Sequence, residues 1–282
     1  MRLDDKSALV TGSTDGVGRV VATRLGEAGA RVLVHGRDAE RGAAVVADIQ
    51  EVGGRAEFLG ADFASLAEVR RFADAVRHRF GRLDILINNA GIGFGGGDHP
   101  GRELSADGYE LRFAVNYLSG FLLTTLLFPL LVQSAPARII NVASAGQYPI
   151  DFDDVMLTVG YDGRRAYRQS KLAQIMATFD WARELREEGV TVNCLHPATF
   201  MNTTMVRQSG IEPWSTVDEG AEAILHLAAS PAVQNVTGRY FDGMRESRAD
   251  AQAYDEEARG RLHALSLELC GLRTGVGGAP PE

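Results

Sequence analysis

Short apolar, β-branched runs alternate with longer segments of helical period along most of this chain. Seven runs are predicted to be strands, at residues 7–11, 31–35, 56–59, 85–88, 138–143, 191–195 and 239–241. Helical stretches of roughly 12 to 25 residues separate them, as right-handed crossovers between parallel strands require. This order predicts an α/β fold with one doubly wound domain, in which helices cover both faces of a seven-stranded parallel sheet.

Charge and hydropathy exclude several classes of function. The formal net charge is -8 and the pI is near 5.3, which argues against a nucleic-acid surface because such surfaces carry clustered positive charge. The longest apolar stretch, 121–132, is interrupted by Pro129 and is shorter than the roughly 20 residues that cross a bilayer. We therefore expect a buried helix and no membrane span.

The N-terminus and the cysteines point to the cytoplasm. Asp4 and Asp5 stand where a secretory signal would carry basic and then apolar residues. Cys194 and Cys270 lack motif spacing, and an intracellular chain keeps such thiols reduced. We expect a cytoplasmic protein without disulfides.

A glycine-rich turn follows the first predicted strand and opens the first helix. Glycines let the backbone bend and approach a pyrophosphate at the positive end of a helix. Tight turns between a strand and a helix also use glycine, so the turn alone is weak support for a nucleotide site. The residues predicted to bind cofactor here are Gly12, Ser13, Thr14, Asp15, Gly16, Val17 and Gly18.

The end of the second predicted strand indicates which dinucleotide is preferred. Arg37 stands where an arginine accommodates the 2′-phosphate of NADP, whereas an acid there selects NAD. The alternative is a surface ion pair between Arg37 and Asp38 or Glu40. Asp15 argues the other way, because its charge would repel a nearby phosphate. We predict that NADP(H) is preferred and that NAD(H) is possible.

Two further loops are candidates for the adenosine half of the cofactor. Asp62, followed by Phe63, could accept a hydrogen bond from the adenine amino group, or could cap the helix that begins near Ser65. The run Asn89-Ala90-Gly91 follows the fourth predicted strand and suits a wall beside the adenosine. Ordinary turn formation would explain this run equally well.

A tyrosine and a lysine share one face of a predicted helix. Lys171 is one of only two lysines in the chain, and it stands four residues after Tyr167. A compact ammonium stabilises phenolate and so brings the phenol closer to neutral pH, where it exchanges protons efficiently. We predict that Tyr167 is the proton donor. A chance spacing with a solvated lysine is the alternative.

With these motifs in order, the chain resembles the short-chain dehydrogenase/reductase superfamily over roughly residues 5–245. The glycine turn, Asp62, the run at 88–91, Asn116, Ser144 and the Tyr167/Lys171 pair occur in that family's order. The resemblance implies a Rossmann domain with Asn116, Ser144, Tyr167 and Lys171 as catalytic residues. In the roles it implies, Ser144 bonds the substrate oxygen, Lys171 holds the nicotinamide ribose and Asn116 positions a water relay. It also implies a small carbonyl or alcohol substrate and a homodimer or homotetramer.

The region between Ser144 and Tyr167 points to a branch of that family. The separation of 23 residues (167 − 144) and the run at 150–154 look like the retinol-dehydrogenase-type enzymes, which commonly handle bulky apolar alcohols and carbonyls. After the sixth predicted strand, Ala198 replaces the glycine that is usual after Pro197. That loop is still expected to meet the cofactor, through Pro197, Thr199 and Thr203.

The domain prediction is one unit over residues 1–272. Within it, 199–216 is a candidate substrate lid and 246–272 a helical appendage, and residues 273–282 follow it as a disordered tail. An irregular surface connection without function is the alternative to the lid. Asp151, Asp153 and Asp154 could attract a hard cation, but a solvated loop is favoured, and the six histidines show no ligand spacing. No metal site is predicted.

Together these features predict an NADP(H)-preferring oxidoreductase acting on a lipophilic or secondary-metabolite carbonyl or alcohol. Two other functions use the same fold. One is a nucleotide-binding sensor without turnover, and the other is an epimerase or dehydratase with no net redox change.

Overall fold

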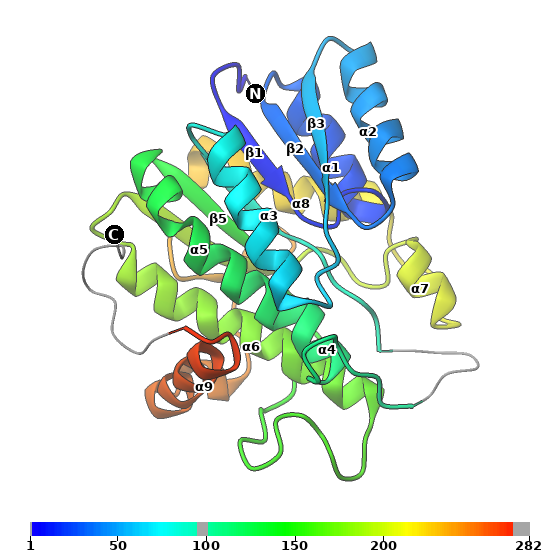
Figure 1. Ribbon diagram of the computed structural model, residues 1–282, viewed down its shortest axis with the longest axis vertical. Coiled ribbons are helices and arrows are strands. Elements are labelled where there is room, and N and C mark those ends of the chain that lie inside the picture. Colours follow the sequence, from blue (N-terminus) through cyan, green and yellow to red (C-terminus); the bar gives the residue numbers. More distant parts are fainter. Residues whose placement is uncertain (1, 95–100, 273–282) are drawn as a thin grey trace.

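The computed structural model describes residues 2–94 and 101–272, which form a three-layer α/β domain (Figure 1). Eight strands form one sheet in the order β3-β2-β1-β4-β5-β6-β7-β8. All neighbouring strands are parallel except β7 and β8. The strands are β1 Ser7–Val10, β2 Arg31–Gly36, β3 Arg55–Gly60, β4 Ile85–Asn88, β5 Ala137–Val142, β6 Val190–His196, β7 Tyr240–Asp242 and β8 Arg245–Ser247.

The predicted count of seven strands is wrong by one. The missed strand, β8, has three exposed residues and pairs antiparallel with β7 at the edge of the sheet. A strand that buries neither face has no need of an apolar pattern, so sequence periodicity gives no signal for it. The other seven strands fall where predicted, with ends that shift by at most one residue.

Alternating side chains divide the core between the two faces of the sheet. Leu9 of β1 packs with α3, α5, α6 and α9, whereas Ala8 and Val10 pack with α1, α2 and α8. The long helices are α1 Gly16–Glu27, α2 Ala39–Glu51, α3 Leu66–Arg79, α5 Ser119–Gln133, α6 Gly163–Glu184, α8 Val217–Ala229 and α9 Glu256–Leu269. The shorter helical segments are α4 Leu111–Phe113, η1 Ala114–Leu118, α7 Thr204–Gln208, η2 Pro231–Val233 and η3 Ala251–Tyr254.

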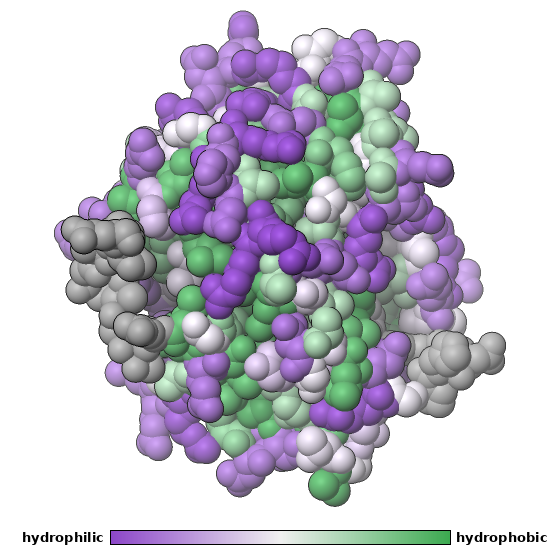
Figure 2. Space-filling model, viewed as in Figure 1, coloured by the Kyte–Doolittle hydropathy of each residue, from purple (hydrophilic) through white to green (hydrophobic). Residues whose placement is uncertain are grey.

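The helix formed by α4, η1 and α5 corrects the length argument made from the sequence. It runs without a break over Leu111–Gln133, and its 23 residues are long and apolar enough for a membrane span by composition alone. However, 67% of its most apolar window is buried inside the protein, and core helices of soluble proteins pass the same test. Figure 2 shows hydrophilic and hydrophobic side chains interleaved over one face of the molecule.

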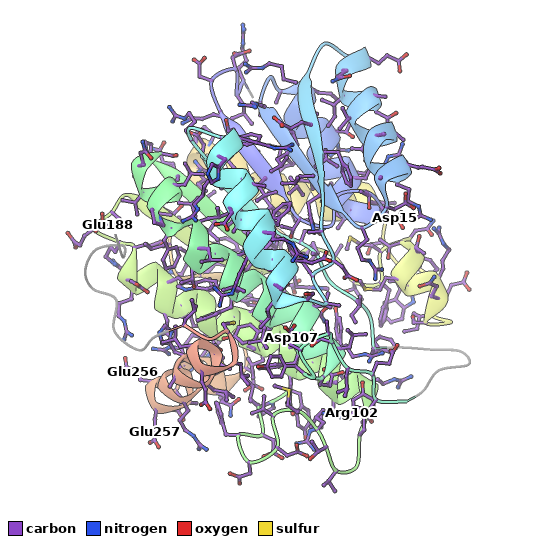
Figure 3. All side chains as sticks on the ribbon, in the orientation of Figure 1. Asp15, Arg102, Asp107, Glu188, Glu256 and Glu257 are labelled. Atoms are coloured by element: carbon purple, nitrogen blue, oxygen red, sulfur yellow. The ribbon has the colours of Figure 1, made fainter. Side chains whose placement is uncertain are left out.

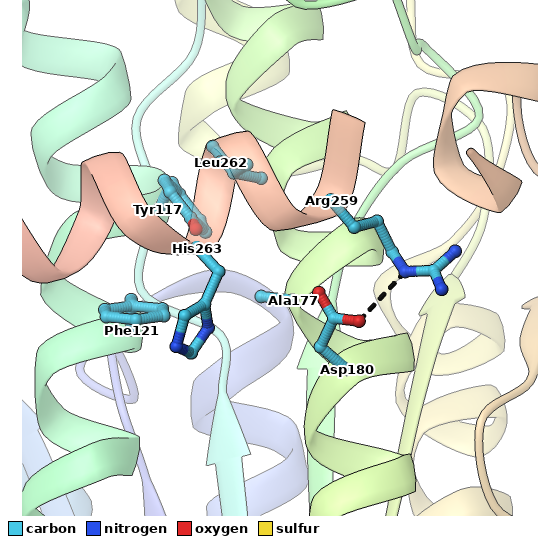
Figure 4. Close-up of a pocket in the computed structure, with 7 residues that line it drawn as sticks. All are labelled: Tyr117, Phe121, Ala177, Asp180, Arg259, Leu262 and His263. Carbon is cyan, nitrogen blue, oxygen red and sulfur yellow. Dashed lines mark hydrogen bonds and ion pairs between the residues drawn. The ribbon is translucent and has the colours of Figure 1, made fainter. Parts of the chain in front are cut away.

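Helix α9 packs against α5 and α6, where the sequence predicts an appendage. The Tyr117 hydroxyl lies 2.7 Å from Ser266 Oγ, and Arg259 Nε donates to Asp180 Oδ1 at 2.9 Å. His263 and Phe121 meet edge to face in the same recess (Figure 4). The appendage is therefore part of the folded core. The predicted tail, 273–282, lies outside the described residues.

Candidate active site

The strand order reverses between β1 and β4, and the candidate residues gather at the carboxyl ends of these strands. The glycine turn after β1 packs tightly against the loop after β4. A Cβ added at Gly12 would lie 2.8 Å from Ala90 Cα, and one added at Gly18 would lie 2.4 Å from Asn89 Nδ2. Both glycines are therefore required by the packing of one chain segment on another. Gly16 is required for a different reason, because its φ is 54°.

Asn89 braces this turn. Its side-chain amide donates to the carbonyl oxygens of Thr11 and Gly12 at 2.8 and 3.0 Å. The Thr11 hydroxyl accepts in return from the backbone N–H groups of Asn89 and Ala90, at 3.0 and 2.9 Å. The predicted wall at 89–91 thus acts as a structural clamp on the glycine turn.

Ser13 and Phe63 turn away from the mouth of the site. The Ser13 hydroxyl is fully buried, donates to Val10 O at 2.7 Å and accepts from His35 N–H at 3.0 Å. Phe63 is buried and stacks on the His35 ring, with the ring centroids 4.0 Å apart. These side chains stabilise the turn from beneath.

His35 is the residue beneath the turn that sequence reasoning missed. Its Nδ1 accepts from Gly12 N–H at 3.0 Å and its Nε2 donates to Ala61 O at 3.2 Å, a tautomer assigned from these two contacts. Burial lowers the pKa of His35 to about 3, so the ring is neutral when it accepts the Gly12 hydrogen bond. The signal available in the sequence is a lone histidine at the end of the predicted strand 31–35.

The residue that directly precedes α1 is acidic. Asp15 caps the helix by accepting from Gly16 N–H at 2.7 Å, and it lies between α1 and α7 (Figure 3). Burial acts to raise the pKa of Asp15, but a hydrogen bond from Thr204, the Gly16 amide and the charges of Arg41 and Arg207 lower it. The carboxylate is therefore partly neutralised by its surroundings.

Arg37 and Arg41 lie on either side of Asp38, the residue that caps α2. Arg41 approaches Asp15 at 3.7 Å and Asp38 at 3.4 Å. Within residues 2–94 and 101–272, Arg37 makes no ion pair, and its side chain is exposed. The surface pair with Asp38 or Glu40, which was the alternative for Arg37, is therefore made by Arg41 instead.

The remaining residues of the predicted adenosine side lie nearby. Thr14 covers Gly36, where an added Cβ would lie 2.5 Å from Thr14 Cγ2, and Val17 is buried in the core. Asp62 accepts from Ala64 N–H at 3.0 Å, while Ser65 caps α3. Asp62 is thus not the helix cap.

Tyr167 and Lys171 face the same space from α6. Lys171 Nζ lies 5.8 Å from the centroid of the Tyr167 ring. Burial raises the pKa of Tyr167, while a hydrogen bond with Ser144 acts to lower it. Burial also lowers the pKa of Lys171 to about 7. Burial of both groups therefore opposes the effect that is expected of the ammonium on the phenol.

Ser144 and Asn116 complete the cluster. Ser144 follows β5, and its Oγ accepts from Gly146 N–H at 3.0 Å. Asn116 lies in the π-helical segment η1, accepts from Ile92 N–H at 2.7 Å, and donates to Ile92 O at 3.1 Å. An added Cβ at Gly91 would lie 3.2 Å from Asn116 Oδ1 and 3.6 Å from Lys171 Nζ. The structure thus brings Gly91, Asn116 and Lys171 together.

The candidate lid, 199–216, contains α7 and lies against the glycine turn. An added Cβ at Gly16 would lie 3.3 Å from Thr203 Cγ2, and Thr203 caps α7. Thr199 is exposed and lies 3.0 Å from His196 Nε2, while Pro197 is buried after β6. The segment 197–203 therefore lies across the cofactor side of the sheet.

These residues fit a nicotinamide dinucleotide. The glycine turn leads into the N-terminus of α1, where backbone N–H groups can bind a pyrophosphate. Lys171 lies beside Gly91, and a side chain at position 91 would crowd the lysine ammonium. The acidic loop serves structure, because Asp151 pairs with Arg165 at 2.9 Å and Asp154 accepts from Thr158 and Val159 N–H groups at 2.8 and 3.0 Å. In the described part of the chain, no three His, Cys, Asp or Glu residues form a metal-ligand group.

Comparison with known proteins agrees with this arrangement. The model of the short chain dehydrogenase family matches residues 6–213. Human retinol dehydrogenase 13 is 36% identical over 287 residues, covering 95% of this chain and 85% of that protein. Human polyprenol dehydrogenase is 33% identical, covering 95% and 86%. The Pseudomonas aeruginosa RhlG/NADP active-site complex has a TM-score of 0.69 at 32% identity, covering 86% of this chain and 95% of that one.

This chain thus combines the reversal at β1 and β4, the glycine turn and the serine, tyrosine and lysine cluster with a family match over most of its length. The chain belongs to the short-chain dehydrogenase/reductase family, on its retinol-dehydrogenase-like branch, and is an enzyme that binds a nicotinamide cofactor.

Proposed function

We propose that this enzyme prefers NADP(H) and interconverts a carbonyl and an alcohol on a lipophilic substrate, with Tyr167 as the acid/base. The observation that carries the proposal is the meeting of Tyr167, Ser144 and Lys171 at the carboxyl end of β5. The nicotinamide, when bound, supplies or accepts the hydride. Tyr167 gives a proton to the substrate oxygen in reduction, and Ser144 donates a hydrogen bond to the same oxygen.

The preference for NADP(H) follows from the charges beyond β2. Arg37 is exposed without an ion-pair partner among the described residues, so its guanidinium is available to a phosphate. Asp15, which argued against this cofactor, is offset by Arg41 at 3.7 Å. Among the solved neighbours, the Pseudomonas RhlG complex and a Burkholderia cenocepacia short chain dehydrogenase are complexes with NADP.

The lipophilic substrate class rests on the side chains around the mouth and on the relatives' names. Phe94 meets Tyr167 edge to face with ring centroids 6.0 Å apart, and Phe200 meets Trp214 at 5.2 Å. Trp214 is 74% exposed on the lid, so a large aromatic surface faces solvent beside the site. Retinol and polyprenol are both extended apolar alcohols, and such a mouth suits molecules of that kind.

Turnover with purified protein tests this proposal. We expect all-trans-retinal and long-chain aldehydes to be reduced with NADPH faster than short polar aldehydes. The loss of NADPH absorbance measures the rate. Tyr167→Phe is expected to lose about 100-fold or more in kcat while still binding NADPH, because the proton donor is lost. NADPH binding without turnover above that of Tyr167→Phe would identify a sensor. Product formed without net cofactor conversion would identify an epimerase or dehydratase.

A further inference from the structure

Two protein oxygens hold the ammonium of Lys171. Nζ donates to the Val142 carbonyl oxygen at 2.9 Å and to Gln174 Oε1, also at 2.9 Å. The side chains of Lys171 and Gln174 are both buried, with 6% of each residue exposed. An ammonium has three donors, so these contacts leave one N–H for other partners.

The position of Gln174 is itself fixed by hydrogen bonds. It lies three residues after Lys171 on α6, so the two side chains share one face of the helix. Its backbone carbonyl accepts from Thr178 Oγ1 at 2.7 Å, and Thr178 Oγ1 accepts from Asn141 Nδ2 of β5 at 2.8 Å. These contacts tie this turn of α6 to the strand that carries Val142. Gln174 is therefore held at a defined distance from the lysine.

We propose that Gln174 is a positioning residue for Lys171, whose amide oxygen fixes the direction of the ammonium and holds it in the charged form. Lys171 is buried, and burial alone favours the neutral amine. A neutral amide oxygen compensates in part, because it accepts a hydrogen bond without removing the positive charge that acts on Tyr167. The inference rests on the proposed function and extends it from the cluster itself to the residue behind it.

Few other titratable groups surround the ammonium. From its own helix, Tyr167 faces it. From the loop after β4 and from η1 the neighbours are Gly91 and Asn116, which carry no charge. Behind Thr178, burial raises the pKa of Cys194 to about 12, so this thiol is neutral. Beyond Ser144, the Arg168 side chain approaches Gly146. A change in the titration of Lys171 on substitution of Gln174 would thus report mainly on the amide oxygen.

The test uses the fact that the chain has two lysines, Lys6 and Lys171. Protein grown with lysine isotopically labelled at Cε gives two NMR signals, each of which can be followed across pH. We expect Gln174→Met, which keeps the volume but removes the acceptor, to lower the pKa of Lys171 by about one unit. Gln174→Glu should raise the pKa, because it places a negative charge at the same position. The Lys6 signal serves as an internal control.

The matched control is Gln169→Met. Gln169 is buried on the same helix, where its Oε1 accepts from Arg165 Nε at 3.1 Å, and among the described residues it makes no hydrogen bond with Lys171. This variant should leave the titration of Lys171 unchanged. In turnover assays, activity should fall at high pH as the ammonium loses its proton. This fall should begin at lower pH in Gln174→Met than in wild type, and its position should not change in Gln169→Met.

The proposal is overturned if Lys171 titrates alike in wild type and Gln174→Met. Should Gln174→Met fail to fold, Gln174→Leu, which also lacks the acceptor, replaces it in this comparison. These signals need no substrate, so they separate this inference from the proposed function. A wild-type enzyme that reduces no carbonyl would remove the proposed function while the titration still reported on the contact.

Discussion

Lys171 lies in a slot that accommodates an ammonium and little more. The side chain is buried, and its nitrogen is within 2.9 Å of two oxygens and beside Gly91. An arginine carries a planar fork with five donors, which these two acceptors cannot satisfy. The size of the slot is thus a reason for a lysine in a chain whose other buried and surface cations are almost all arginines.

Lys171→Arg is therefore expected to lose most activity although the charge is kept. The fork would leave buried donors unsatisfied and displace the cation from Tyr167. We expect a fall of roughly 100-fold in kcat/KM, measured with NADPH and a long-chain aldehyde. Lys6→Arg is the control, because Lys6 pairs with Asp84 outside the site. Near-normal turnover in Lys171→Arg would remove the lysine from the proposed chemistry.

Arg37→Ala is expected to weaken binding of NADPH by roughly 10- to 100-fold and to change NADH binding little. The reason is loss of a charge-assisted hydrogen bond to a phosphate that only NADPH carries. Fluorescence titration of both cofactors measures the ratio. Arg19→Ala provides the control, since Arg19 pairs with Asp48 on the outside of α1. Equal weakening of both cofactors would mean that Arg37 does not contact the 2′-phosphate.

Residues that act through a fixed spacing could be found from the sequence, and residues that act through packing could not. Tyr167 and Lys171 are separated by one helical turn, so their shared face follows from helix geometry. His35 reaches Gly12 from a strand that pairs with β1, and Gln174 reaches Lys171 through a contact that has no motif. Their neighbours become known only when the strands are placed in register.

At the scale of elements, the glycine turn is determined by contact between two loops. Gly18 lies in the first turn of α1, and an added Cβ there would lie 2.4 Å from both Gly12 O and Asn89 Nδ2. These are atoms of the clamp and not of a ligand. The sequence-based explanation, approach of a pyrophosphate, therefore accounts for only part of the glycine pattern.

Gly18→Ala is expected to destabilise the protein by about 1–3 kcal/mol, because the new methyl group displaces the clamp. The cofactor affinity should fall with it, since the turn moves. Gly260→Ala is expected to have the opposite effect on stability. Gly260 lies inside α9, and nothing lies within 4 Å of an added Cβ at that position. That variant should gain about 0.5–1 kcal/mol. Chemical denaturation compares the two, and a neutral Gly18→Ala would argue against the clamp.

Elements that need no amphipathic pattern were the ones the sequence did not predict. β8 is exposed, and the π-helical turn of η1 differs from its neighbours by a single hydrogen-bond register. In the candidate lid, α7 has no buried residue, and its five residues are too few to show a period. Strands buried on both faces, in contrast, were placed to within two residues.

At the scale of the whole molecule, the neutral state of His35 links stability to pH. Its pKa falls to about 3 in the folded protein, so the unfolded chain binds a proton more readily. The stability is therefore complete above the ordinary histidine pKa of about 6.5 and is lost as the pH falls below it. Burial lowers the pKa of His196 as well, which adds in the same direction.

We expect the free energy of unfolding to fall by about 2 kcal/mol between pH 7 and pH 5 through His35 alone. Urea denaturation at several pH values measures this loss. His35→Gln removes the titrating group, and its smaller dependence on pH isolates the contribution of the ring. The same slope in both proteins would show that His35 titrates normally.

Assembly and location stay predictions at this scale. We expect a homodimer or homotetramer in the cytoplasm, and the molar mass from light scattering tests the first of these. The helix at Leu111–Gln133 is long and apolar but packs inside the domain, so detergent-free purification with intact secondary structure is the expected behaviour.

The two lysines differ in burial and lie toward opposite ends of the parallel strands. Lys6 directly precedes β1, at the amino ends of the parallel strands, and its side chain is 34% exposed. Lys171 is buried near the carboxyl ends of the strands, where its Nζ contacts Val142 O of β5. Of the two lysines, only Lys6 is therefore open to an amine-reactive resin, and coupling through it would hold the enzyme with its catalytic mouth turned outward.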